Sequence, residues 1–119
     1  MTKEQYNLLA AELQKRGYKK YHNGHANEDY GWFKSPIPRK SEWNNSPYQI
    51  EFAVWDYTDY KKSRKHDSFP DYGVTVAILV STDKIDRIDM ELSYKNQSID
   101  DIEKIAASFY EWCENNFNK

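Results

Sequence analysis

Hydrophobic residues near the N-terminus recur at the spacing of an amphipathic helix. Tyr6, Leu9 and Leu13 lie three and four residues apart, so a helix would place them on one face. Gly17 follows this segment, and glycine readily adopts the left-handed conformation that ends a helix. The pattern predicts a first helix over residues 2–16 with one buried face.

A second apolar stripe with helical spacing lies near the C-terminus. Ser98 and Asp101 stand three residues apart, which is the spacing of a capping pattern at the start of a helix. The residues of the predicted buried stripe are Ile102, Ile105, Ala106, Phe109 and Cys113. We expect a final helix that begins at Ser98.

Between these helices, apolar and polar residues alternate with the period of two that is typical of β-strands. The predicted strands lie at residues 18–22, 30–33, 48–57, 73–82 and 85–94. Residues 73–82 are apolar on both faces, which favours a central position in the sheet. Pro36, Pro38 and Pro47 predict a long irregular loop over residues 35–47.

The first two strands admit two registers. Asn23-Gly24 is the strongest sequence signal for a two-residue hairpin turn, and that turn would set His22 opposite His25. A wider loop would instead set Tyr18 opposite Trp32. The sequence leaves both registers open.

These elements predict one α+β domain over residues 1–119. The order is α-β-β-β-β-β-α, with an antiparallel meander sheet and with the N- and C-terminal helices packed on one face. Two layers suit a sheet and helices that each have one apolar face. The residues predicted to be buried in mutual contact are Phe52, Val76, Ile78, Leu92, Ile105 and Phe109.

Composition narrows the class of protein without identifying a family. The chain has 119 residues, of which 39% are hydrophobic and 30% charged, and its net charge is -2. These values are typical of soluble globular domains. No apolar run approaches the roughly 18 residues of a membrane-spanning helix, and the first residues do not resemble a signal peptide. We expect a cytoplasmic protein that does not bind membranes.

No catalytic, cofactor or metal motif stands out. The four glycines are too scattered for a phosphate-cradling loop, and one cysteine with three histidines cannot form a structural zinc site. Cys113 lies on an apolar stripe, so we expect it to be a packing residue. We therefore expect no cofactor and no metal, and we favour a binding protein over an enzyme.

Aromatic residues provide the first candidate binding surface. Trp55, Tyr57 and Leu79 point away from the more apolar face of the sheet and would form a patch on the other face. Trp and Tyr are favoured anchors of protein interfaces. The 35–47 loop, which carries Trp43, is long enough to cover this face, so the patch is either open or covered. Trp43 is counted among the candidate partner-binding residues.

A basic segment, residues 57–67, provides the second candidate surface. In a meander, this segment and the Asn23-Gly24 turn should emerge at the same end of the sheet. Its cations would attract phosphate groups, and neighbouring tyrosines would stack on bases. Acidic residues within the segment partly neutralise it. The candidate residues are Lys61, Lys62, Arg64, Lys65, His22, His25 and His66.

The leading interpretation is a binding module that engages a protein partner, or a second copy of itself, through the Trp55 face and the long loops. The alternative is the binding of nucleic acid or another phosphate-bearing ligand through residues 57–67. An apolar sheet face favours the first interpretation, and converging basic groups favour the second.

Overall fold

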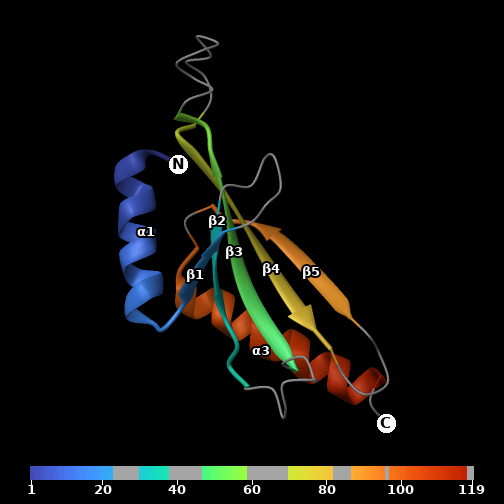
Figure 1. Ribbon diagram of the computed structural model, residues 1–119. Coiled ribbons are helices and arrows are strands. Elements are labelled where there is room, and N and C mark those ends of the chain that lie inside the picture. The colour runs from blue at the N-terminus through green and yellow to red at the C-terminus, as the bar shows by residue number, and fades with distance from the viewer. Residues whose placement is uncertain (23–29, 38–46, 59–69, 82–86, 96, 118–119) are drawn as a thin grey trace.

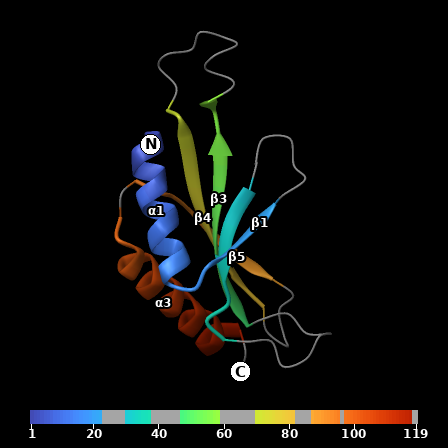
Figure 2. The same ribbon diagram turned by 60° about the vertical axis from the view of Figure 1, so that its left-hand side comes forward.

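The computed structural model describes residues 1–22, 30–37, 47–58, 70–81, 87–95 and 97–117. Its elements are α1 (Lys3–Lys15), β1 (Lys19–His22), β2 (Tyr30–Lys34), β3 (Tyr48–Asp56), β4 (Tyr72–Val80), β5 (Ile88–Ser93) and α3 (Ile99–Phe117). The strands form one antiparallel sheet in the order β1-β2-β3-β4-β5 (Figure 1). Both helices lie on the same side of this sheet (Figure 2). The predicted α+β fold with a meander sheet is confirmed.

Local interactions set the ends of both helices. The Thr2 side chain accepts a hydrogen bond from the Gln5 N–H, and the Gln5 side chain accepts one from the Thr2 N–H. Together they form a capping box at the start of α1. Gly17 has a φ of 90°, which glycine adopts without steric cost, and it turns the chain away from α1. At α3, Ser98 Oγ accepts a hydrogen bond of 3.1 Å from the Asp101 N–H.

The register of the first hairpin corrects the prediction of a tight turn. His22 pairs with Tyr30, and Lys20 pairs with Trp32, so β1 and β2 are joined by residues 23–29. The two-residue turn, which would set His22 opposite His25, is therefore wrong. The alternative of a wider loop is correct, although Lys20 rather than Tyr18 faces Trp32.

Burial of the aromatic residues of β2 explains this register. Trp32 is buried, and its Nε1–H donates a hydrogen bond of 3.3 Å to the Tyr6 hydroxyl of α1. Lys20 covers the same face, with its Nζ 4.4 Å from the centre of the Tyr30 ring. A tight turn at Asn23-Gly24 would carry Tyr30 and Trp32 past the start of β1 and leave them without a neighbouring strand.

The core lies between the helices and the inner face of the sheet, which we define as the face turned toward α1 and α3. Residues on this face of β3 and β4 alternate with residues on the outer face, as predicted. The fully buried side chains include Leu13, Phe52, Val54, Val76, Ile78, Ile102, Ala106 and Cys113.

The predicted core residues are confirmed at the centre of the sheet, but one predicted residue near its edge is not buried. Phe52, Val76 and Ile78 are fully buried, whereas Leu92 and Phe109 are half-buried. Ile105 is 40% exposed, so its predicted burial is wrong. Its position on α3 is beside β5, the last strand of the sheet, and no further strand among the described residues covers it.

Replacing Ile102 by alanine should lower the free energy of unfolding by about 2–5 kcal/mol, because the change leaves a cavity under a fully buried side chain. Ile105→Ala removes the same atoms from the same helix, but at a position that is 40% exposed, so we expect less than half that loss. Urea denaturation followed by circular dichroism measures both. Equal losses for the two variants would contradict this packing of α3.

Candidate functional site

The predicted partner-binding residues Trp55, Tyr57 and Leu79 lie on the outer face of the sheet, turned away from the helices. The register sets Trp55 opposite Gly73 and Leu79 opposite Gln49. Trp55, Tyr57 and Leu79 are all half-buried. Both described helices lie on the other side of the sheet, so neither covers this face (Figure 2).

Two glycines allow aromatic rings to lie against the outer face. Gly31 pairs with Tyr21, and a Cβ built on Gly31 would overlap the Tyr21 ring. A Cβ built on Gly73 would lie 3.2 Å from Cε2 of Tyr57. Each tyrosine ring thus occupies the space that a side chain at its glycine would take, so the backbone approaches the ring closely.

Tyr21 and Phe33 extend this surface toward β1. Their rings meet edge to face, with centroids 5.9 Å apart. The small residues Gly31 and Ala53, which are paired across β2 and β3, lie between them and Trp55. We call the set Tyr21, Phe33, Trp55, Tyr57 and Leu79 the outer aromatic surface. The sequence interpretation missed Tyr21 and Phe33 because it left the hairpin register open, and the register alone places them on the Trp55 face.

Among the described residues, the charged side chains beside the outer aromatic surface are three acids and two bases. Glu51 and Glu91 lie in one cross-strand row of the outer face, separated by β4. Asp89 is also on this face, and Arg87 Nε donates a hydrogen bond of 2.7 Å to its Oδ1. Lys19 lies opposite Phe33, in the same cross-strand row as Glu51 and Glu91. The described charges are therefore mixed and do not form the basic surface that phosphate groups require.

Most of the second candidate surface lies outside the described residues. His22 is exposed at the end of β1 and belongs to the inner face, with its ring centroid 6.5 Å from that of Tyr30. It therefore does not share a face with Trp55. The end of β1 and the end of β3 lie at the same end of the sheet, as the meander predicts. The predicted site residues outside the described part of the chain are His25, Trp43, Lys61, Lys62, Arg64, Lys65 and His66.

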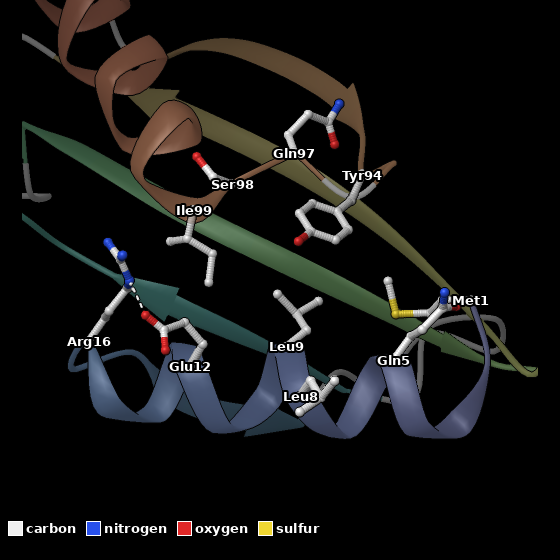
Figure 3. A pocket seen from close by; sticks show the side chains of 10 residues that line it. All are labelled: Met1, Gln5, Leu8, Leu9, Glu12, Arg16, Tyr94, Gln97, Ser98 and Ile99. Atoms are coloured by element: carbon white, nitrogen blue, oxygen red, sulfur yellow. Dashed lines mark hydrogen bonds and ion pairs between the residues drawn. The ribbon is translucent and has the colours of Figure 1, made fainter.

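A cleft that the sequence did not predict opens between α1 and the start of α3 (Figure 3). Its volume is about 430 Å³. Its lining includes Leu9, Tyr94 and Ile99, which come from different segments of the chain. A local sequence pattern could therefore not predict it. The full lining is Met1, Gln5, Leu8, Leu9, Glu12, Arg16, Tyr94, Gln97, Ser98 and Ile99.

Arg16 lines this cleft and joins the end of α1 to the start of α3. Its guanidinium contacts Asp100 Oδ1 at 2.6 Å, Glu12 Oε1 at 2.8 Å and Glu103 Oε1 at 3.2 Å. The hydrogen bond from Arg16 holds the pKa of Asp100 below its ordinary value. Because three carboxylates already hold Arg16, it is poorly placed to bind an anionic ligand in the cleft.

Few described groups have the environment of a reactive centre. Cys113 is fully buried, and burial raises the pKa of its thiol, so the thiol remains protonated and weakly nucleophilic. Burial, followed by the nearby Glu103 carboxylate, raises the pKa of Tyr18. Within the described ranges, no group of three or more His, Cys, Asp or Glu side chains could hold a metal ion. No helix in those ranges is long and apolar enough to cross a membrane.

Comparison with known proteins found no matching family model, no matching curated protein and no matching solved structure. The geometry of the outer aromatic surface is therefore the main basis for a functional proposal.

Arg16→Gln should destabilise the protein at neutral pH and much less in acid. The lowered pKa of Asp100 means that its stabilising bond is present above the unfolded value of 3.8 and is lost as pH falls through the folded value. The difference in Tm between wild type and Arg16→Gln should therefore shrink as pH falls below about 4. Lys15→Gln removes a neighbouring exposed cation and is the control. A difference that stays constant from neutral pH into acid would contradict the role of this network.

Proposed function

We propose that this protein is a binding module that holds a protein partner on its outer aromatic surface. One observation supports the proposal most directly. Four aromatic side chains and Leu79 gather on the sheet face that neither helix covers, over the small residues Gly31, Ala53 and Gly73. Apolar patches of this kind on a sheet are typical of interaction sites.

The glycines give this surface a rigid shape. An aromatic ring that lies on the backbone of a neighbouring strand has little freedom to rotate, so it loses little conformational entropy when a partner covers it. The edge-to-face contact of Tyr21 and Phe33 restricts these two rings further. The Tyr57 ring lies against Gly73, which is the cross-strand pair of Trp55. Such preorganised aromatic side chains are the usual anchors of protein interfaces.

Charge favours a protein over a nucleic acid as the occupant of this surface. Phe33 has Glu51 on one side and Lys19 on the other. Glu91 lies opposite Ala77, and the charge of Arg87 is paired with Asp89. A nucleic acid stacked on these aromatic residues would bring its phosphates toward the carboxylates. A protein with an apolar contact surface and a few basic residues meets no such repulsion.

The alternative function, binding of a phosphate-bearing ligand through residues 57–67, is supported by the arrangement of the strand ends. The connections after β1 and after β3 leave the same end of the sheet, which is the geometry that the alternative needs. Tyr57 lies at that end, on the outer face. The cations themselves lie outside the described residues, so the alternative has less support than the protein-binding proposal.

Photo-crosslinking in the cells that produce the protein tests the leading proposal. A crosslinking amino acid at Leu79 or Thr75, both on the outer face of β4, should form an adduct with the same partner protein. The same amino acid at Ala11 or Gln14, which are exposed on α1, should not. Trp55→Ala should weaken the interaction by at least about 30-fold if Trp55 is a central anchor.

Leu8→Ala is the control for that substitution, because Leu8 is a large apolar side chain, 74% exposed, on α1, which lies on the other side of the sheet (Figure 2). It should leave the adduct unchanged. Adducts of equal yield from α1 and β4, or adducts that survive Trp55→Ala, would refute the proposal.

Fluorescence anisotropy with a labelled single-stranded oligonucleotide separates the two functions. The alternative predicts affinity that weakens as salt rises and that is lost when Lys61, Lys62, Arg64 and Lys65 are replaced by alanine. The protein-binding proposal predicts no salt-dependent binding by the wild-type protein. Binding that is lost in the quadruple variant would establish the alternative.

A further inference from the structure

β5 is an edge strand whose outward backbone groups have no partner strand among the described residues. The Tyr94 N–H donates to Val74 O, and in an antiparallel pair alternate residues direct their backbone groups to the same side. The register therefore turns the N–H and C=O groups of Asp89, Glu91 and Ser93 away from β4. Asp89 and Glu91 present both backbone groups to an additional strand. Ser93 presents its N–H, because its C=O accepts a hydrogen bond of 3.3 Å from Gln97 Nε2.

A groove lies beside this edge on the inner face. It has a volume of about 420 Å³ and is lined by Met90, Lys104, Ile105, Ser108, Phe109 and Trp112. Ile105 is 40% exposed and Trp112 is 51% exposed. The ring of Trp112 stacks on that of Phe109 at 6.3 Å between centroids, which holds it in place. Among the described residues, the two-layer core is thus incomplete at this edge.

The two faces of β5 differ in chemistry. Ile88, Met90 and Leu92 point inward. All three are half-buried, whereas the side chains at the centre of the core are fully buried. Asp89 and Glu91 point outward. Successive side chains of a strand added beside β5 would point to opposite faces of the sheet. One set would lie on the inner face, beside Met90 and the groove, and the other set on the outer face, beside Glu91. The first set must be apolar, and the second is favoured when basic.

We propose that the β5 edge, with its groove against α3, binds an extended segment of another protein in which apolar and basic residues alternate. Backbone hydrogen bonds to Asp89, Glu91 and Ser93 would supply affinity. The groove would take an apolar side chain, and Glu91 would select a basic one. This site lies apart from the outer aromatic surface, and the proposal does not depend on the function proposed for that surface.

Charge disfavours a second copy of this chain as the occupant in two of the three central registers. Two β5 strands that pair antiparallel around a two-fold axis must match residues of the same face. Registers centred on Met90 or Glu91 then oppose Asp89 to Glu91, or Glu91 to Glu91. The register centred on Asp89 opposes Asp89 to Asp89 but also sets Arg87 opposite Glu91 on each side. Like charges directly opposite each other destabilise a strand pair. A basic segment relieves this repulsion.

The other edge of the sheet is less suited to strand addition. β1 has only four residues, and its side chains include Lys19, Lys20 and His22. Short, lysine-rich strands are a common protection against unwanted pairing. β5 has six residues and three apolar side chains on its inner face.

Hydrogen exchange measured by NMR on the full chain tests the proposal, with a synthetic heptapeptide of alternating lysine and valine as the probe. The amides of Asp89, Glu91 and Ser93 should exchange about tenfold more slowly when roughly 90% of the protein is bound, because only the unbound fraction exchanges. A heptapeptide of alternating glutamate and valine should give much less protection. A peptide with the same lysines and valines in separate blocks should also give less.

Two variants separate the parts of the site. Ile105→Lys places a charge in the groove and should weaken binding of the lysine-valine peptide, whereas Ala107→Lys, an exposed change elsewhere on α3, should not. Glu91→Lys should shift the preference toward the acidic peptide by about threefold. Absence of protection at the three amides would overturn the proposal. Protection that grows with protein concentration alone, together with a doubled mass, would overturn it in favour of a dimer.

Discussion

The pairing of β3 with β4 is the interaction on which the other elements depend. The two strands pair along their whole length, from Tyr48 opposite Val80 to Asp56 opposite Tyr72. Their inner faces carry the fully buried side chains of the sheet, against which α1 and α3 pack. The first residue of the chain is also fixed here, because the Met1 amino group donates a hydrogen bond of 2.6 Å to Tyr72 O. Burial is therefore concentrated on one face, and the composition of the other face is not constrained by the core.

Because the core lies on one side of the sheet, the residues of the outer face carry information about function. A sheet face that no helix covers often carries polar side chains. Here, Gly31, Ala53 and Gly73 lie on this face, and a tyrosine ring lies against each of the two glycines. Glycine in the interior of a strand lowers stability because it has no side chain to pack. A tyrosine ring on the glycine restores part of that packing, so the same rings contribute to the stability of the sheet and to the shape of the surface.

The sequence predicted most accurately those helices and strands that bury one face against one neighbouring layer. The alternation in β3 and β4 and the apolar stripe of α1 each match one buried face, and each was predicted correctly. The first hairpin was ambiguous, because the local preference of Asn23-Gly24 competes with the burial of Trp32, and burial determines the register. Ile105 has helical spacing typical of a core residue, but the sheet ends before it. Such errors arise where tertiary packing, rather than the local sequence pattern, determines which side chains are buried and how strands pair.

The exposure of Ile105 and Trp112 follows from their place on α3, which crosses the strands obliquely (Figure 1). The groove that they line also includes Met90 of β5, the last strand of the described sheet. The apolar inner side chains of β5 are half-buried, whereas those of β3 and β4 are buried. Among the described residues, the apolar surface left exposed on α3 therefore lies beside the sheet edge whose outward backbone groups have no partner strand.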